Sequence, residues 1–418
     1  MVGEVQAERM LSARCCIVGG GPAGMMLGFL LARAGIDVVV LEKHADFLRD
    51  FRGDTIHPST LQLMHELGFY DEFLKLPHQE APTVHGRIGD LDVTIADLRH
   101  LPTRAKFIAL MPQWDFLNFL AEHGRRYPTF RLVMRAEATD LVMEGDTVAG
   151  VRATTPEGPL KIRAPLVVGC DGRHSVMRAR AQLETENLGA PMDVLWFRVS
   201  RKPDDPVDVM GTFAAGQILV SINRGDYWQC AYVIAKGTTD ELRERGLADF
   251  RARVAHLAPR IADRVGEIAD WDQVKLLTVM VDRLKQWYRP GLICIGDAAH
   301  AMSPIGGVGV NLAVQDAVAA ANILAEPLRH GTLTTDVLRR IQERRAFPTA
   351  VMQRLQLFVQ DRLIARVLGS AENVKPPLVV RLINYVPALR RIPARIIGLG
   401  VRPEHIATPD VAPRARAD

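Results

Sequence analysis

Cysteine is scarce and unpatterned in this chain. The 418 residues include five cysteines, an odd number, and no two of them form a C-x-x-C pair. Four lie in apolar runs, so we expect buried thiols in a reducing compartment rather than a disulfide framework. The chain also lacks an H-E-x-x-H motif and any His/acid cluster with metal-ligand spacing, so we predict no metal site.

Other absences narrow the class of protein. The N-terminus has acids and no apolar segment of the signal-peptide type, and no run of 18 apolar residues occurs. We therefore expect a cytoplasmic protein with no transmembrane segment. A net charge of only +4 argues against nucleic-acid binding. The hydrophobic fraction of 48% is typical of a globular protein. A chain of 418 residues is long enough for two to three domains.

The pattern of apolar runs predicts an α/β fold. Buried strands are predicted at 14–18 and 36–42, with a helix at 25–34 between them, which makes a βαβ unit with parallel strands. Residues 192–235 change to shorter strands joined by tight turns, typical of a separate antiparallel sheet. Helical patterns dominate after the last buried strand, at 291–295.

These patterns predict the domain organisation. The α/β domain is expected to use about 1–80, 100–190 and 285–345. Stated as segments, the expected organisation is 1–190 for the first part of that domain, 191–284 for an inserted β-sheet substrate domain, 285–345 for the completing part, and 346–418 for a C-terminal helical region and basic tail.

A glycine-rich turn follows the first strand. Gly19, Gly21 and Gly24 form G-x-G-x-x-G at the start of the helix, with Pro22 and Ala23 inside the motif. The first glycine allows the tight turn, the second lets a pyrophosphate approach the backbone, and the third lets helix and strand pack closely. The free N–H groups and the positive dipole end of the helix then face the diphosphate.

An acid ends the second strand. Glu42, followed by Lys43, lies 18 residues beyond the last glycine of the motif. A carboxylate at this place accepts hydrogen bonds from the adenosine ribose hydroxyls. The βαβ unit therefore predicts a dinucleotide site but does not distinguish FAD from NAD.

Two further motifs point to the cofactor. Asp171-Gly172 and Gly296-Asp297 each follow a buried strand. With the first motif and in this order, they resemble the single-component flavoprotein aromatic hydroxylases, the class A flavin monooxygenases of the para-hydroxybenzoate hydroxylase type. The resemblance covers the predicted α/β domain well and residues 191–284 poorly. It implies a Rossmann-like FAD-binding domain with an inserted substrate domain.

The resemblance also implies roles for individual residues. Asp297 would bond the ribityl hydroxyls of FAD, and Asp171 with Gly172 would serve the pyrophosphate and the nicotinamide cofactor. Arg52 resembles the arginine that reaches back over the pyrophosphate, and Gln113 a residue that contacts the ribityl chain. The loop and helix start that would border the flavin ring comprise Pro304, Gly307, Gly309, Val310 and Asn311.

The resemblance implies that the cofactor, rather than a side chain, carries out the redox chemistry. In this family NAD(P)H reduces the flavin, O2 gives a C4a-hydroperoxide, and this hydroxylates an aromatic or other electron-rich hydrophobic small molecule. No catalytic side chain is assigned, and His300 is interpreted as a packed histidine rather than a base. No second G-x-G-x-x-G exists, consistent with NAD(P)H as a transient co-substrate. The substrate is expected beside the strands at 217–234, whose pocket face the sequence leaves open.

Alternative functions remain open at this point. One is an FAD-dependent reductase of an isoprenoid- or quinone-like substrate, and another is a non-catalytic FAD-binding protein. A flavin-dependent halogenase is disfavoured, because no two of the five tryptophans lie two residues apart.

The C-terminal tail carries the whole net charge. Residues 381–418 hold seven arginines and three acids, and residues 376–402 are apolar with interspersed arginines. Such a segment could rest on an anionic membrane surface. We favour a clasp packed on its own domain, because Pro387 and Pro393 interrupt its helical pattern.

Overall fold

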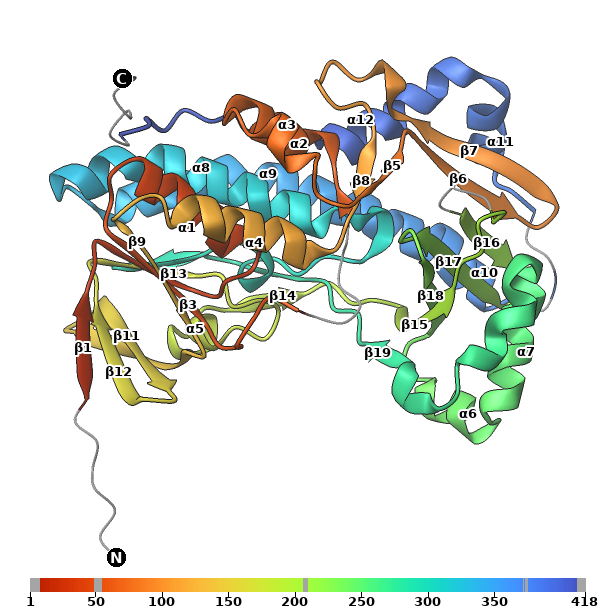
Figure 1. Cartoon of the computed structure of the whole chain (residues 1–418), viewed down its shortest axis with the longest axis horizontal. Helices are drawn as coiled ribbons and strands as arrows, with labels where there is room; N and C mark the ends of the chain where they lie inside the picture. The colour runs from red at the N-terminus through yellow and green to blue at the C-terminus, as the bar shows by residue number, and fades with distance from the viewer. Residues whose placement is uncertain (1–7, 49–54, 206–209, 371, 373–374, 412–418) are drawn as a thin grey trace, which may run out of the picture.

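The computed structural model describes residues 8–48, 55–205, 210–370, 372 and 375–411. Two β-sheet regions lie side by side, with long helices across one of them (Figure 1). The predicted fold class is confirmed: a Rossmann-like α/β domain, a second sheet and a helical C-terminal region.

The first sheet has six strands and is parallel except at one edge. Its central strands are short, apolar and fully buried, because helices or a second sheet cover both faces. Across the sheet the strands are β21 (Tyr288–Arg289), β22 (Leu292–Cys294), β13 (Leu166–Gly169), β2 (Cys15–Val18), β3 (Val38–Glu42) and β9 (Phe130–Met134).

Helices cover one face of this sheet (Figure 1). The predicted βαβ unit is confirmed, since β2 and β3 pair in parallel on either side of α1. The helix α1 packs against α4 and α8, and α8 packs against α9. Their bounds are α1 (Pro22–Arg33), α4 (Gln113–Gly124), α8 (Gly309–His330) and α9 (Thr335–Val359).

A four-stranded sheet packs on the other side. Its antiparallel core comes from the turn-rich segment after β9, and the N-terminal strand joins it in parallel. The strands, in spatial order, are β1 (Arg9–Ser12), β12 (Gly158–Arg163), β11 (Thr147–Thr155) and β10 (Glu137–Glu144).

The second large sheet extends beyond the predicted insert. Residues 191–284 supply five of its strands, but a hairpin from residues 83–97 adds two more. The expected boundaries 1–190 and 191–284 therefore need correction. The seven strands are β19 (Lys275–Leu277), β15 (Met192–Ser200), β18 (Tyr227–Ala235), β17 (Gln217–Asn223), β16 (Met210–Ala214), β6 (Thr83–Ile88) and β7 (Leu91–Asp97).

The hairpin joins the sheet at β16. The strands of the insert pair antiparallel, as predicted. The β16–β6 pair, which joins the hairpin to the insert, is parallel. Within the insert alone β16 would be an edge strand with unpaired backbone groups, and β6 pairs with them. Between β18 and β19 the chain forms α6 (Thr239–Glu244), α7 (Leu247–Leu257) and a 3-10 helix η2 (Pro259–Glu267).

Smaller elements join these layers. They are β4 (Thr55–Ile56), α2 (Pro58–Glu66), α3 (Tyr70–Phe73), β5 (Gln79–Ala81), η1 (Leu98–His100), β8 (Ile108–Leu110), α5 (Val176–Arg180), β14 (Thr185–Asn187), η3 (Trp271–Gln273), β20 (Asp282–Leu284), η4 (Gly296–Ala298) and η5 (Ile305–Gly307).

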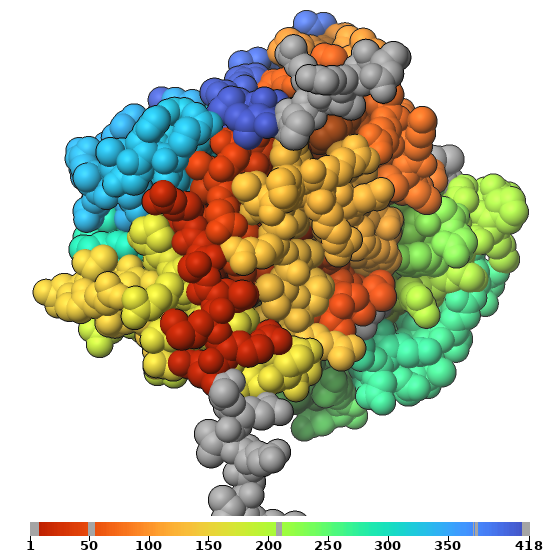
Figure 2. All heavy atoms as spheres, turned by 60° about the vertical axis from the view of Figure 1, so that its left-hand side comes forward, coloured from red at the N-terminus to blue at the C-terminus, as the bar shows by residue number. Residues whose placement is uncertain are grey.

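The C-terminal region leaves the Rossmann-like α/β domain and returns to it. After α9 come a π-helical turn η6 (Gln360–Ile364), α10 (Ala365–Leu368), α11 (Leu378–Tyr385), η7 (Pro387–Arg390) and α12 (Arg391–Leu399). Residues 400–411 then run over the surface beside the N-terminal elements, dark blue against red in Figure 2. There the carbonyl of Thr408 accepts from Arg33 Nη1 at 2.7 Å, and Glu404 pairs with Arg344. These contacts fasten residues 400–411, called the clasp below, to the domain. The clasp was predicted for residues 376–402. There Ala394 and Leu399 of α12 are buried, but Leu378 and Leu382 of α11 are exposed, so the prediction is wrong for α11.

One helical stretch, Ile305–His330, is long and apolar enough to cross a membrane by length and composition, although no such run was expected from the sequence. In the structure 78% of its apolar window is buried inside the protein, as in a core helix. All five cysteines are free thiols, four of them buried.

Candidate cofactor-binding site

The predicted motifs meet at one edge of the six-stranded sheet. The parallel strands β2, β3, β13 and β22 are hydrogen-bonded neighbours in the order β22-β13-β2-β3. At their carboxyl ends, β2 leads into Gly19–Gly24 and β3 ends at Glu42. β13 leads into Asp171-Gly172, and β22 leads into Gly296-Asp297. This edge of an open α/β sheet is where ligands bind. The structure therefore brings the separate motifs into one site.

Each glycine of the first motif has a different structural reason. A Cβ on Gly24 would lie 1.9 Å from the Gly19 carbonyl oxygen, and one on Gly19 would lie 2.3 Å from the Cys170 carbonyl oxygen. Neither position tolerates a side chain, because the clash is with backbone. A Cβ on Gly21 would meet no atom within 4 Å. Gly21 is thus the glycine that leaves open space where a ligand can approach the backbone.

Glu42 is buried and organises the same turn. Its carboxylate accepts from the backbone N–H of Gly20 and of His44, each at 3.0 Å. Lys43, the next residue, is exposed. Glu42 thereby fixes the turn from the neighbouring strand, in addition to lying where a ribose would bind.

The Asp171 carboxylate accepts hydrogen bonds from the start of α5 (Val176–Arg180). One oxygen accepts from the Ser175 hydroxyl at 2.6 Å and the other from the Met177 backbone N–H at 3.1 Å. Burial raises the pKa of Asp171, and these hydrogen bonds act in the opposite direction. Gly172 has φ +83°, and a Cβ there would meet nothing within 4 Å. The backbone at Gly172, rather than the Asp171 side chain, is the open part of this motif.

The third motif touches the first. Gly296 has φ +61°, and a Cβ on it would lie 3.2 Å from the Ala23 Cβ. Asp297 follows in η4 and is half-buried at the end of β22. Arg178 of α5 also reaches this turn, since it donates to the Ala298 carbonyl at 3.5 Å. The second and third motifs are therefore joined by an arginine that the sequence did not single out.

A buried charged cluster anchors the third motif. Asp316 of α8 accepts from the Gly296 backbone N–H at 3.1 Å, from His300 Nε2 at 2.5 Å and from Arg345 Nε at 2.8 Å. Arg345 also donates to Glu404 of the C-terminal segment at 3.2 Å. Burial alone raises the pKa of Asp316, but the charges and hydrogen bonds of His300 and Arg345 outweigh it and hold that pKa below its usual value.

Sequence reasoning missed most of this cluster. His300 was interpreted as a packed histidine, and the structure places it 1% exposed against Asp316. Asp316 is the one acid in the apolar segment 308–325, a pattern that could have marked a buried partner. Glu404, distant in sequence, gives no such signal.

The loop after η4 carries the residues expected beside the flavin ring. Pro304 precedes η5, and Gly306 and Gly307 have φ +76° and +62°. Thr55 Oγ1 donates to the Gly307 carbonyl at 3.1 Å, which fixes the loop to β4. α8 begins directly after this loop. The first backbone N–H groups of a helix have no hydrogen-bond partner within the helix, so those of α8 lie at the loop and can bind a ligand there.

Asn311 serves the fold with its side chain. Its Oδ1 accepts from the His57 backbone N–H at 3.0 Å and from Thr60 Oγ1 at 2.7 Å. His57 Nδ1 bonds the Ile397 carbonyl at 2.7 Å, and burial lowers the pKa of His57 to about 4, so this ring is neutral. The backbone N–H groups at 309–311, including Val310, are what this helix start can offer a cofactor.

Two glutamines, one in α9 and one in η6, form hydrogen bonds to the loop that contains Ser303 and Ile305. Gln356 accepts from the Ser303 backbone N–H at 3.2 Å and donates to the Ser303 and Ile305 carbonyls, both at 2.9 Å. Gln360 donates to Ser303 Oγ at 2.7 Å. These residues were not predicted, because glutamine in a helix is usually a solvent-exposed residue.

Two predicted residues remain to be placed. Gln113 is the first residue of α4 and follows β8, which pairs with β4 beside the Gly307 loop. Arg52 lies outside the described residues, so its expected role stays a prediction.

The structure decides which face of the second sheet looks toward the site. On one face Leu219 packs with Phe197, Trp228 and Phe250 against α7. On the other face, the side chains of the strands pack with Ile305 of the loop and Ile364 of η6. The strand residues are Val194, Trp196, Ile218, Val220, Ile222, Ala231 and Val233. Val220 and Ile222 are only half-buried there. This second face, called the loop-side face below, borders the predicted flavin position.

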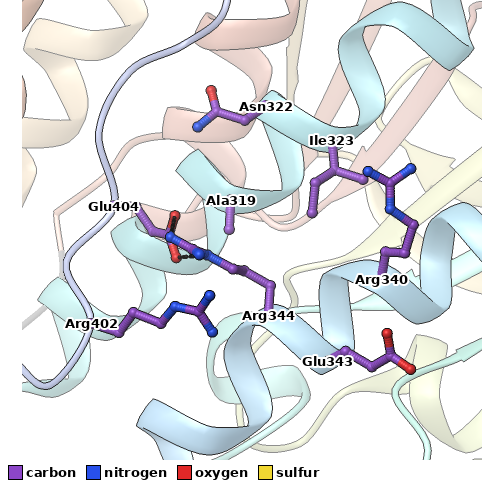
Figure 3. Close-up of a pocket in the computed structure, with 8 residues that line it drawn as sticks. All are labelled: Ala319, Asn322, Ile323, Arg340, Glu343, Arg344, Arg402 and Glu404. Carbon is purple, nitrogen blue, oxygen red and sulfur yellow. Dashed lines mark hydrogen bonds and ion pairs between the residues drawn. The ribbon is translucent and has the colours of Figure 1, made fainter.

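A separate cleft lies between α8, α9 and the C-terminal segment (Figure 3). Its lining includes Arg340, Arg344, Arg402 and Glu404, and Arg344 pairs with Glu404 at 2.7 Å. None of the eight lining residues is a predicted cofactor residue. Among the residues that the structure describes, no group of three or more His, Cys, Asp or Glu side chains could hold a metal ion.

These residues fit a flavin adenine dinucleotide. The open backbone at Gly21 and Gly172 and the helix N-termini of α1 and α8 suit a diphosphate and the polar edge of a flavin. Asp297 supplies a half-buried carboxylate between them.

Comparisons with known proteins agree. A family model described as an FAD binding domain matches residues 12–355. The 6-methylpretetramide 4-monooxygenase of Streptomyces rimosus is 32% identical over 385 residues, which are 91% of this chain and 91% of that protein. The 12-dehydrotetracycline 5-monooxygenase/anhydrotetracycline 6-monooxygenase of Streptomyces rimosus subsp. rimosus is 29% identical over 72% of this chain, which spans only 60% of that protein.

Solved structures share the fold. The p-nitrophenol 4-monooxygenase from Pseudomonas putida DLL-E4 superposes with a TM-score of 0.74 at 20% identity, over 94% of this chain and 100% of that chain. A probable FAD-dependent monooxygenase from Pseudomonas aeruginosa gives 0.73 at 20% identity, over 85% and 98%.

Proposed function

The chain belongs to the FAD binding domain family and is an FAD-dependent aromatic monooxygenase, and we propose that it hydroxylates a fused-ring phenolic compound with NAD(P)H and O2 as co-substrates. The observation that carries the proposal is the convergence of four strand ends on one edge, beside an apolar sheet face. The proposed substrate class is supported by the relative named 6-methylpretetramide 4-monooxygenase and by the apolar side chains of the loop-side face.

The residues that would hold FAD are those at the sheet edge. Gly21 and the start of α1 would bind the diphosphate, and Glu42 the ribose. Asp297 would bind the ribityl chain, and the N–H groups at 309–311 the flavin ring. When bound, FAD supplies redox chemistry and oxygen activation that no side chain can supply.

The chain's own residues position the substrate and keep water out. The loop-side face is apolar, so it favours a flat aromatic molecule over a polar one. The partial positive charge at the N-terminal end of α8 would stabilise negative charge on a flavin bound there. Gln356 and Gln360 keep the intervening loop fixed between these two parts.

We propose that NAD(P)H binds only transiently, since this chain has a single G-x-G-x-x-G. We expect a cytoplasmic protein. Two other functions were considered, a reductase of isoprenoid- or quinone-like compounds and a non-catalytic FAD-binding protein. In the experiment below the first predicts a different product and the second predicts none.

The decisive experiment offers the purified protein NAD(P)H, ¹⁸O₂ and a panel of fused-ring phenols. We expect at least one compound to stimulate NAD(P)H oxidation and to gain one labelled oxygen atom. A product that gains two hydrogens and no oxygen would establish the reductase instead. No NAD(P)H oxidation by the FAD-loaded protein with any compound would favour the non-catalytic protein.

The cofactor half can be tested without turnover. Asp297→Ala removes a charge-assisted hydrogen bond worth about 1.5–3 kcal/mol, so FAD affinity should fall roughly ten- to hundred-fold. Fluorescence titration of the apoprotein with FAD measures the change. Asp270→Ala, on an exposed acid in the second sheet region, is the control and should leave the affinity unaltered. Equal affinity in Asp297→Ala and the natural protein would contradict the assigned site.

A further inference from the structure

Helix α11 is docked with its polar side chain inward. Asn384 Oδ1 accepts from the Thr94 backbone N–H at 3.2 Å, and its Nδ2 donates to the Asp92 carbonyl at 3.2 Å. Both partners lie on β7, the strand under the helix. A surface helix of a globular protein normally buries its apolar side and exposes its polar side. Here the asparagine faces the protein, so the apolar side chains are left outward.

Those apolar side chains are highly exposed. Leu378 is 79% exposed, Leu382 54% and Tyr385 71%, and their spacing of four and three places them on one side of the helix. Val379, Val386 and, on α12, Ile392 are exposed as well. We call these six residues the outer face. Exposed apolar side chains that adjoin one another mark an interaction surface.

The segment that carries the outer face has charges of one sign, whereas β7 under α11 carries the exposed acid Asp92. From residue 373 to residue 403 the sequence has no Asp or Glu. Arg381, Arg391 and Arg395 are exposed, and none of them makes an ion pair with any residue that the structure describes. Arg390 differs, because it donates to the carbonyls of Ile383 and Asn384 at the end of α11. Three arginines thus remain for an external anionic partner.

We infer that the outer face docks on an anionic lipid bilayer. Leucine and tyrosine side chains can enter the headgroup region, while the arginines beside them meet lipid phosphates. Figure 1 shows α11 and α12 at a corner of the molecule beside the β6–β7 hairpin, where a flat surface can reach them. The clasp at residues 400–411 is a separate part of the tail, so one tail both fastens the domain and presents a membrane-binding surface.

Vesicle flotation tests this inference on the full-length, FAD-loaded protein. We expect binding to vesicles of phosphatidylcholine with phosphatidylglycerol, weaker binding to phosphatidylcholine alone, and loss of binding at high salt. Arg381→Gln with Arg391→Gln and Arg395→Gln should weaken binding about five-fold per residue. Leu378→Ser with Leu382→Ser and Tyr385→Ser should weaken it by roughly ten-fold or more.

Controls make either result informative. Met10→Ser removes an exposed apolar side chain of β1, at the other end of the molecule, and should leave vesicle binding unchanged. All the variants should keep the melting temperature and the FAD content of the natural protein, because the altered side chains are exposed. The inference is overturned if the protein ignores anionic vesicles, or if both variant sets still float. It is also overturned if the outer face forms a dimer that the serine substitutions dissociate while no vesicle binding is seen.

Discussion

The cofactor side and the substrate side of the site are built on different principles. On the cofactor side, backbone lies against backbone: Gly24 against Gly19, and Gly19 against Cys170. On the substrate side, side chains of strands pack with a loop, and Val220 and Ile222 remain half-buried. The first arrangement admits no added atom, whereas the second can change its lining without moving a strand. This difference lets a family keep one cofactor site while its substrates vary.

The largest expected effect concerns the anchor of the cofactor side. Asp316→Asn removes the negative charge of the fully buried carboxylate to which both His300 and Arg345 are hydrogen-bonded. Loss of one member of a buried ion pair costs about 3–5 kcal/mol. Urea unfolding should show this loss, and FAD should bind more weakly because the Gly296 N–H loses its charged acceptor. Asp336→Asn is the control, since Asp336 pairs with Arg339 at the surface, where a pair is worth about 0–1 kcal/mol.

The same cluster predicts an acid dependence. The pKa of Asp316 is lower in the folded protein than in the unfolded chain, so its contribution is complete above the unfolded value and is lost as pH falls through the folded one. The natural protein should therefore lose more stability than Asp316→Asn does when pH drops below about 4. Parallel pH curves for the two proteins would contradict the assigned role.

The next effect separates two glycines of one motif. Gly24→Ala places a Cβ 1.9 Å from the Gly19 carbonyl oxygen, so the turn must move, and overpacking of this kind costs about 1–3 kcal/mol or more. Gly21→Ala places its Cβ in open space, so it should leave the melting temperature nearly unchanged and still weaken FAD binding. Thermal unfolding of the apoproteins and FAD titration measure the two effects. If both variants unfold alike, the distinction between packing and ligand approach is wrong.

The contrast also explains what the sequence could predict. The βαβ unit, the four strand ends and the motifs that follow them are local patterns, and the structure has them where they were expected. Glu404, Gln356 and the β6–β7 hairpin act through contacts between residues far apart in sequence. Their local surroundings resemble those of ordinary surface residues, so no periodicity or motif marks them.

A similar limit applied to the faces of the second sheet. Alternation separates Leu219 from Val220, but both are apolar and either could face a core. Only the position of α7 on one side and of Ile305 on the other assigns them. The C-terminal tail shows the same point. A contact of the tail with its own domain was predicted, but the link from Glu404 through Arg345 and Asp316 to Gly296 was not.

The smallest expected effect tests the substrate side. Val220→Ala removes two carbons from the half-buried loop-side face, where the proposed substrate lies. At about 0.8 kcal/mol per buried carbon, the KM for an accepted phenol should rise roughly four-fold if the substrate covers one of these carbons and roughly fifteen-fold if it covers both. FAD affinity should stay the same, because no cofactor residue is touched. Val199→Ala makes the same substitution on the opposite face, where Val199 is 1% exposed. It should lower the melting temperature and leave KM unchanged. If instead Val199→Ala changes KM and Val220→Ala only stability, the substrate lies on the α7 side and the assignment of the two faces must be reversed.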